Sequence, residues 1–418
     1  MIEISARLTR GAIYFAGEVL ECWITLRNSS AEPGEKDASA KAGVGPGETA
    51  SVAFVSGQIH CQCSVEESKV VLPADFSQAD LGKRRDSSTN LSDQNTFCLV
   101  STVPKLLVGS LSLAPGEEFN VLYSETIPKS DVPSFRGGIL VRYAWKLAFG
   151  CQVLGRDTTV IHIPLYILVI KDLENLLNLN DDLRMLAITE DLAENASAPK
   201  TNGSNGATKE NGIHASYPAV TIEAAMEILD NLTSRKSLKT YNIESSSGKI
   251  GKLSLSKTKF RLGEDILGRF DFKDRSITCV QYLVSLISEE SIKEEHRKSK
   301  NIAPTETIAG KVHDFCLCLE QTNFILPVPL HITPSFSSDI MELKWKLRLE
   351  FALSGEILQL DVPAVGQAEQ SVLWRPPLRV PVETLVWDVP VEIFPTDPIQ
   401  VQSAHLRDSL GSDVRVRL

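Results

Sequence analysis

Three blocks of sequence occur twice in this chain, in the same order, on either side of a polar middle segment. The first block has an aromatic residue, then a Gly-Glu turn, then a run in which apolar and polar residues alternate. The second has Pro-Ser-Phe and later Trp-Lys-Leu, and the third is a short apolar run around a proline. An ordered repeat predicts two units of the same fold. The block pairs are residues 14–26 and 260–272, 133–147 and 334–347, and 163–167 and 389–393.

The spacing of the blocks differs between the two copies, and the difference falls in low-complexity sequence. Gly17 and Pro133 are 116 positions apart, whereas Gly263 and Pro334 are 71 positions apart. Two polar inserts account for most of the excess, and surface loops accept such insertions at little cost. The duplicated residues suit a turn, a loop that enters a strand, and a buried Trp. We therefore interpret them as structural residues.

Apolar residues alternate with polar ones over much of the chain, as in Val19 to Leu26, and clusters of Gly, Pro, Ser and Asn separate these runs. A period of two between turn signals favours antiparallel sandwiches over βαβ units. We therefore predict an all-β chain of two tandem antiparallel β-sandwich domains. The predicted parts are an N-terminal sandwich at 1–171, a flexible linker at 172–240, a C-terminal sandwich at 241–400 and a tail at 401–418.

Two stretches of the linker have the periodicity of a helix. Residues 172–186 are leucine-rich and acidic, and residues 221–232 begin with a Thr suited to an N-cap position. The second stretch places four apolar side chains on one face: Ile222, Met226, Leu229 and Leu232. Such a face docks into the groove of a partner or packs on the chain's own C-terminal sandwich. We favour packing and keep partner docking as the alternative.

Four polar segments are predicted to be loops or disordered, because none can bury enough apolar surface to offset the entropy lost on ordering. The segments are 29–49, 77–96, 190–216 and the charge run 289–301. The second segment contains Arg84-Arg85-x-Ser87, which resembles a basophilic kinase site in a flexible loop. Ser87 and Ser88 are therefore candidate phosphorylation sites.

Composition excludes several classes of function. A net charge of −10 at pH 7 argues against a nucleic-acid binder, which needs a basic face. The N-terminus lacks a signal-peptide pattern, and the longest apolar run, 161–170, is about half of what spans a bilayer. We expect a cytosolic protein that associates only peripherally with membranes. Its 8 cysteines are interpreted as small buried thiols in a reducing compartment.

No pattern of catalytic, cofactor-binding or metal-ligating residues stands out. Gly-x-Ser-x-Gly and the phosphate-binding loop of P-loop GTPases are both absent. The histidines have no metal-binding spacing, and the Cys-x-Cys pairs at 61–63 and 316–318 do not have zinc spacing. We predict no catalytic residue, no cofactor and no metal. An enzyme on a β-sandwich scaffold is therefore the least favoured class of function.

Both halves open with an aromatic residue and Gly-Glu before a strand and later carry Pro-Ser-Phe, and in this they resemble the arrestin fold. The closer resemblance is to the Rgp family, the arrestin-like subunit of the Ric–Rgp complex. The resemblance covers most of the chain apart from the inserts. The segments that carry it are 11–18, 58–62, 133–137 and 150–152.

The resemblance to the Rgp family implies a non-catalytic partner subunit of a guanine-nucleotide exchange factor. The other subunit would be a large Ric-type β-propeller, and the complex would activate a Golgi Rab GTPase in retrograde traffic. The implied location is the cytosol and, through the complex, the Golgi membrane. The alternative is an arrestin-like adaptor that links membrane cargo to coat or ubiquitin machinery. Those adaptors usually carry Pro-Pro-x-Tyr, whereas this chain has Arg375-Pro376-Pro377-Leu378.

Overall fold

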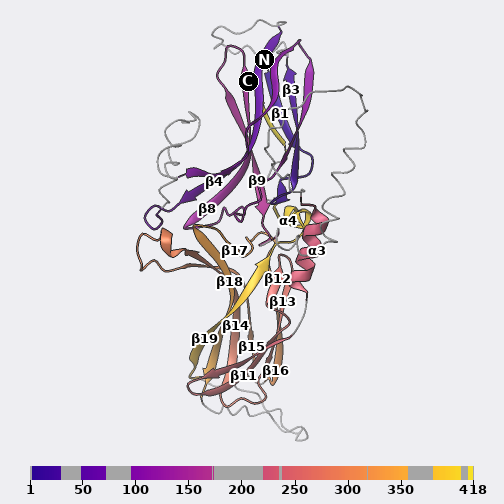
Figure 1. Ribbon diagram of the computed structural model, residues 1–418. Coiled ribbons are helices and arrows are strands. Elements are labelled where there is room, and N and C mark those ends of the chain that lie inside the picture. The colour runs from indigo at the N-terminus through magenta and orange to yellow at the C-terminus, as the bar shows by residue number, and fades with distance from the viewer. Residues whose placement is uncertain are drawn as a thin grey trace, which may run out of the picture.

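A computed structural model of the chain describes residues 2–29, 49–71, 96–171, 173, 220–234, 238–317, 319–355, 380–405 and 413–417. These residues form two β-rich halves placed end to end (Figure 1), so the predicted all-β fold with two sandwich halves is confirmed. Each half combines a four-stranded sheet with a six-stranded sheet. Among the helices of the described residues, none is long and apolar enough to cross a membrane.

The N-terminal half combines the first strands of the chain with one strand from its C-terminal end. Its four-stranded sheet has the order β20-β1-β3-β7. Its six-stranded sheet has the order β2-β9-β8-β4-β5, and β6 also pairs with β4. The strands are β1 (Ile2–Leu8), β2 (Ile13–Phe15), β3 (Val19–Asn28), β4 (Ala50–Val65), β5 (Thr96–Ser101), β6 (Lys105–Leu113), β7 (Glu118–Thr126), β8 (Val141–Val153), β9 (Thr159–Leu168) and β20 (Asp413–Arg417).

The C-terminal half repeats this plan, so the duplication in the sequence is a duplication of the fold. Its sheets have the orders β10-β11-β13-β16 and β12-β19-β18-β14-β15, and β17 pairs with β18. The parallel pair β12–β19 is the counterpart of the parallel pair β2–β9. The strands are β10 (Lys239–Ser245), β11 (Gly248–Leu255), β12 (Lys259–Arg261), β13 (Asp265–Asp271), β14 (Thr278–Ile292), β15 (Thr305–Phe315), β16 (Gln321–Pro327), β17 (Phe336–Ser337), β18 (Met341–Ser354) and β19 (Glu383–Phe394).

The alternation that predicts a half-buried strand is realised in β3. Leu20, Cys22, Ile24 and Leu26 are all buried, and the side chains between them are exposed or half-buried. Successive side chains of a strand point to opposite faces. One face of β3 therefore supplies the core between the two sheets of the N-terminal half.

The duplicated Gly-Glu turns and tryptophans have the structural roles predicted for them. Gly17 and Gly263 have φ angles of 90° and 81°, in the left-handed region that favours glycine. Trp145 and Trp345 are buried, and each donates its indole N–H to a backbone carbonyl, at 3.0 Å and 3.1 Å respectively. A buried aromatic ring whose polar atom is hydrogen-bonded anchors the core of each half.

The C-terminal residues return to the N-terminal half. Helix α4 (Pro398–His405) lies against β2, and its Val401 is fully buried. β20 then pairs antiparallel with β1 and becomes the edge of the four-stranded sheet. The prediction of a tail at 401–418 is therefore wrong for these elements. β20 has 5 residues, too few for a clear periodicity, and its main-chain pairing with β1 leaves no trace in composition.

The charge run at 289–301 is only in part the loop that its composition predicts. β14 continues through Ile292, and a short 3-10 helix, η2 (Glu294–His296), follows it. Glu290 is buried within β14. The loop prediction is therefore wrong for 289–292. A carboxylate can be buried only where it has hydrogen-bond donors. Here the donors come from residues far away in the sequence, so the local composition does not reveal them.

Several predicted segments lie outside the described residues. The insert at 29–49 is described only at residues 29 and 49, the insert at 77–96 only at residue 96, and 190–216 is not described at all. Of the candidate helix at 172–186, only Leu173 is described. The helix predicted at 221–232 is confirmed as α3 (Ile222–Thr233).

Candidate interaction surfaces

Helix α3 packs on the core of the chain itself. The Thr221 hydroxyl accepts a hydrogen bond from the backbone N–H of Ala224 at 3.2 Å, the N-cap that the sequence predicts. Ala225, Ile228 and Leu229 belong to the hydrophobic core of the C-terminal half. Packing on the chain's own sandwich is therefore confirmed, and partner docking by α3 stays a prediction. On the face that was the candidate for docking, Leu229 is buried. The other three residues are half-buried: Ile222, Met226 and Leu232.

Polar contacts at both ends of α3 connect the helix to the duplicated turns of the two halves. The backbone N–H of Val220 donates to the carbonyl of Gly17, in the N-terminal turn, at 3.0 Å. The Asp230 carboxylate pairs with Arg261, beside the C-terminal turn, at 2.6 Å. Figure 1 shows α3 alongside the boundary between the halves. The helix is therefore anchored to both sandwiches.

A buried carboxylate joins the two halves directly. Glu290, on β14 of the C-terminal half, accepts hydrogen bonds from three consecutive backbone N–H groups of the N-terminal half. The donors are Ile139 at 2.9 Å, Leu140 at 2.8 Å and Val141 at 2.9 Å. Hydrogen bonds to an ionised acceptor are roughly twice as strong as neutral ones. Glu290 therefore fixes β14 against the loop that leads into β8.

Aromatic packing surrounds this contact. The Phe336 ring packs edge-on against Phe135, with ring centroids 5.4 Å apart, and against Tyr143 at 6.1 Å. The Tyr143 hydroxyl is also 2.8 Å from the Ser338 hydroxyl. Phe135 and Phe336 are the phenylalanines of the two Pro-Ser-Phe blocks, so equivalent residues of the two halves meet at the junction. The halves therefore share a packed core as well as a linker.

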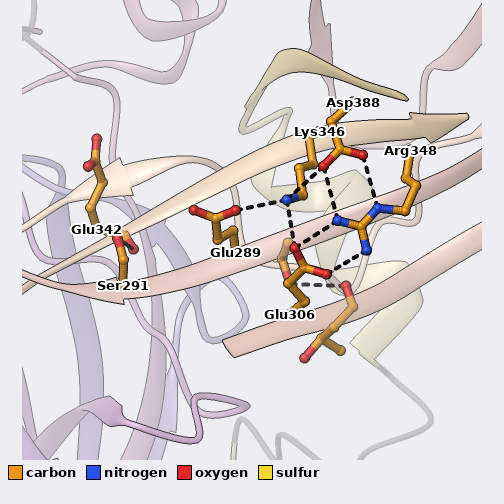
Figure 2. Close-up of polar contacts among 9 residues, drawn as sticks. Glu289, Ser291, Glu306, Glu342, Lys346, Arg348 and Asp388 are labelled. Carbon is orange, nitrogen blue, oxygen red and sulfur yellow. Dashed lines mark hydrogen bonds and ion pairs between the residues drawn. The ribbon is translucent and has the colours of Figure 1, made fainter. Parts of the chain in front are cut away.

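The outer face of the C-terminal six-stranded sheet carries a closed group of ion pairs (Figure 2), here called the Lys346 network. Its members are Glu289, Glu306, Lys346, Arg348 and Asp388. The Lys346 ammonium lies 2.9 Å from Glu289, 2.6 Å from Glu306 and 3.0 Å from Asp388. Arg348 pairs with Glu306 at 2.7 Å and with Asp388 at 2.9 Å. The five residues come from β14, β15, β18 and β19, so the network joins four adjacent strands.

The ion pairs shift the protonation equilibria of the network. Burial alone would lower the pKa of Lys346, but hydrogen bonds to Glu306, Glu289 and Asp388 raise it above its usual range. The hydrogen bonds from Arg348 and then Lys346 hold the pKa of Glu306 below its usual value. The hydrogen bond from Arg348 does the same for Asp388. Each charged side chain of the network therefore has a partner of opposite charge within the network.

Replacing Lys346 with methionine is expected to lower the free energy of unfolding by about 1–2 kcal/mol near neutral pH, since three carboxylates lose a shared cation at a partly exposed site. The pKa values of Glu306 and Asp388 are lowered in the folded chain. The stability that these two carboxylates contribute to the folded chain is therefore present above about pH 5. It is lost as the pH falls through their pKa values in the folded chain. The variant should lose less stability than the wild-type protein between about pH 5 and pH 3.

Chemical denaturation at neutral and acidic pH measures both effects. Lys344→Met is the matched control, because Lys344 lies on the same strand and its side chain is 62% exposed. An equal acid-induced loss in the Lys346 variant and the wild-type protein would contradict the central role of Lys346.

The outer face of the N-terminal six-stranded sheet also carries a lysine, with different neighbours. The Lys146 ammonium donates to the side-chain oxygen of Gln62 at 2.6 Å. The rings of His60 and His162 lie edge-on with centroids 6.0 Å apart. Burial, then His162 and Lys146, lower the pKa of His60 to about 4, so its ring is neutral near pH 7. This face therefore differs from the Lys346 network in the residues whose contacts with its central lysine the structure describes.

Several cysteines of the described ranges have buried thiols. Within the described ranges, no group of three His, Cys, Asp or Glu residues is placed to hold a metal ion. Burial raises the pKa of Cys63 to about 12 and that of Cys151 to about 11. The hydrogen bond with Cys316, at 3.3 Å between the sulfur atoms, raises the pKa of Cys279. These thiols stay protonated and are poor nucleophiles.

Glu290 and Lys346 are functional candidates that composition does not reveal, although each carries a signal in the sequence. The alternation of Leu286, Glu290 and Ile292 on one face of β14 continues into the charge run. Lys346 belongs to the duplicated Trp-Lys-Leu block, where the sequence draws attention to the tryptophan. The predicted phosphorylation sites Ser87 and Ser88 lie outside the described residues, and that prediction stays open.

Comparison with known proteins gives consistent matches along the chain. The model of the Rgp1 family matches residues 72–172 and 169–354. A Homo sapiens protein described as RAB6A-GEF complex partner protein 2 is 36% identical over 406 residues, which is 95% of this chain and 96% of that protein. The Bos taurus protein of the same description is 36% identical over 424 residues, covering 99% of this chain and 100% of the relative. The matched region includes both halves and their junction.

Proposed function

This chain belongs to the Rgp1 family, and from that premise we propose that it is the partner subunit of a guanine-nucleotide exchange complex for a Rab GTPase. Its relatives are described as partner proteins of a RAB6A-GEF complex, so the proposed client is a GTPase of the RAB6A type. The observation that carries the proposal is the match over nearly the full length of both chains.

An exchange factor needs no covalent chemistry. It binds the nucleotide-free GTPase more tightly than the nucleotide-bound form and so favours release of the nucleotide. A rigid pair of sandwiches with long exposed sheet faces suits this task, because the contacts across the junction hold the faces in fixed positions. In this proposal the chain supplies binding surface, is not an exchange enzyme by itself, and requires no cofactor.

The proposed second subunit is a large Ric-type β-propeller protein, in agreement with the resemblance found in the sequence motifs. The proposed place of action is the Golgi membrane, in retrograde endosome-to-Golgi and intra-Golgi traffic. The chain reaches this membrane peripherally, through the complex. Between activations it resides in the cytosol.

Affinity purification of the full-length tagged chain from cells that contain the propeller protein is expected to recover that protein as a stoichiometric partner. The GTPase should be recovered with the complex when nucleotide is removed by chelating Mg²⁺, and should be lost when GTP and Mg²⁺ are restored. Recovery of the folded chain without a propeller subunit would contradict the proposal. The tag expressed alone is the control.

A further inference from the structure

The outer face of the N-terminal four-stranded sheet carries an exposed tryptophan. Trp23, on β3, is 48% exposed and alternates with buried residues, so its ring points away from the core. Arg7 on β1 and Leu122 on β7 lie opposite Trp23 on the two neighbouring strands, and both are exposed. Val19 and Glu21, earlier on β3, are exposed on the same side of the sheet. We call these five residues the Trp23 face.

The same sheet position in the other half is polar. In the first pair of duplicated blocks, Trp23 corresponds to Arg269. Arg269 lies between Ser254 and Asn323 on the neighbouring strands, and its guanidinium donates to the side-chain oxygen of Gln321. Both copies of the sandwich form, so the fold does not require an apolar residue at this position. A tryptophan beside an arginine is instead typical of protein interfaces, since these residue types are enriched among the side chains that contribute most to binding.

Two exposed charges of opposite sign lie next to Trp23, in directions at right angles to each other. Arg7 is its neighbour on the adjacent strand, about 4.8 Å away, and Glu21 lies two residues before it on β3, about 6.6 Å away. A two-fold axis through Trp23 that bisects this angle exchanges the two directions. It therefore places Arg7 of one copy on Glu21 of the other copy, and Glu21 of the first on Arg7 of the second.

We propose that the Trp23 face binds the same face of a second copy of this chain, in a two-fold symmetric dimer. Each contact of such an interface occurs twice, once for each copy. The axis lies between the two sheets, and their strands cross at about 90°, one of the two usual arrangements of packed sheets. Trp23 packs on its own counterpart at the axis, and an ion pair of Arg7 with Glu21 lies on each side. This assembly goes beyond the proposed function, because it concerns two copies of the chain itself.

The size of the sheet sets the strength of the dimer. The sheet is four strands wide, about 19 Å, and β3 has 10 residues, about 33 Å. Each copy therefore offers a face of about 600 Å², so the dimer buries about 1,200 Å² in total, at the lower end of specific interfaces. We expect a reversible dimer with a Kd on the order of 10 µM.

The charges of the Trp23 face favour a second copy over a membrane as the occupant. The face has one cation and one anion, whereas an anionic membrane recruits proteins through clusters of roughly four to eight basic residues. Farther along the same sheet, Arg27 already pairs with Glu118 at 3.3 Å. One positive and one negative residue beside an apolar centre are complementary to the same pattern turned over. Electrostatic complementarity of this kind determines which partner binds and in which orientation.

Self-association of the purified full-length chain tests the proposal first. Analytical ultracentrifugation over a range of concentrations should show a monomer and a dimer in equilibrium. Trp23→Ser is expected to raise the Kd of the dimer about tenfold or more, because it removes the centre of the interface. Leu154→Ser changes an exposed apolar residue elsewhere in the same half, so it is the matched control and should leave the Kd unchanged. Since both side chains are exposed, thermal unfolding of each variant should match that of the wild-type chain.

Two charge reversals test the pairing of Arg7 with Glu21. Arg7→Glu and Glu21→Arg should each raise the Kd about tenfold or more, because each brings like charges together at both symmetric contacts. An equimolar mixture of the two variants restores opposite charges at both contacts and should dimerise as the wild-type chain does. The double variant with both changes should also dimerise normally. Mixing cannot repair a folding defect in either variant, so this rescue is specific to the proposed contact.

A wild-type chain that stays monomeric up to about 200 µM would overturn the proposal. So would a dimer that Trp23→Ser leaves intact, or charge variants that neither the mixture nor the double change rescues. Ile325→Ser alters the outer face of the other four-stranded sheet, and a dimer lost only in that variant would place the contact there instead. Binding of the partner subunit should be unchanged in every variant. Loss of that binding without loss of self-association would assign the Trp23 face to the partner subunit and overturn the proposal.

Discussion

Replacing Glu290 with alanine is expected to lower the free energy of unfolding by about 3–4 kcal/mol, because two buried N–H donors and one partly buried donor lose their acceptor at once. These donors, Ile139, Leu140 and Val141, lie in the N-terminal half, whereas Glu290 lies in the C-terminal half. The loss should therefore also loosen the junction between the sandwiches. Chemical denaturation measures the stability, and hydrogen exchange of the three amides measures the loosening.

A second variant separates the charge from the shape of the side chain. One oxygen of Glu290 accepts from Leu140 and Val141, and the other accepts from Ile139. Glu290→Gln keeps an oxygen that can accept from both Leu140 and Val141. The variant should lose about 1–2 kcal/mol of unfolding free energy. Glu295→Ala, an exposed position in η2, is the control and should change stability by less than about 0.5 kcal/mol. Equal effects of Glu290→Ala and Glu295→Ala would contradict the role given to the buried carboxylate.

Gly138→Ala is expected to destabilise the chain by about 2–3 kcal/mol, because the position has no room for a Cβ atom. A methyl group at Gly138 would overlap the backbone carbonyl oxygen of Val141 and the ring of Phe135. The first of these lies in the segment that donates to Glu290, and the second packs on Phe336 at the junction. Displacement of the loop should therefore disturb both junction contacts, and thermal unfolding measures the combined loss.

The adjacent glycine offers a matched control in the same loop. A Cβ atom at Gly137 would meet no atom within 4 Å, so Gly137→Ala should change the free energy of unfolding by less than about 0.5 kcal/mol. Similar losses from the two substitutions would show that the backbone conformation of the loop disfavours alanine at both positions. In that case the close contact at Gly138 would not be the cause.

Much of the fold follows from local sequence pattern. Paired sandwiches are predicted by the alternation in β3, the two Gly-Glu turns and the two Pro-Ser-Phe blocks. The structure has two such halves. These features are predictable because strand period, left-handed turns and buried aromatic residues depend on residues close together in the chain. The cap and position of α3 are predictable for the same reason.

The interaction surfaces depend on residues that are distant in the sequence. Glu290 can be buried because it accepts hydrogen bonds from donors about 150 positions away in the sequence. Composition alone would place it in a solvated charge run. The pairing of β20 with β1 joins the two ends of the chain through main-chain hydrogen bonds, which have little side-chain signature. The Lys346 network likewise appears only when strand registers show which residues of β14, β15, β18 and β19 face each other.

The central claim is that this chain acts as one subunit of a Rab exchange complex. Its most direct test is the rate of GDP release from a RAB6A-type GTPase, measured with the chain alone, with the propeller subunit alone, and with both. The account predicts that the chain alone leaves the rate unchanged, and that both subunits together raise it well above the sum of their separate effects. Full acceleration by the chain alone, or no difference when the chain is added to its partner, would contradict the account.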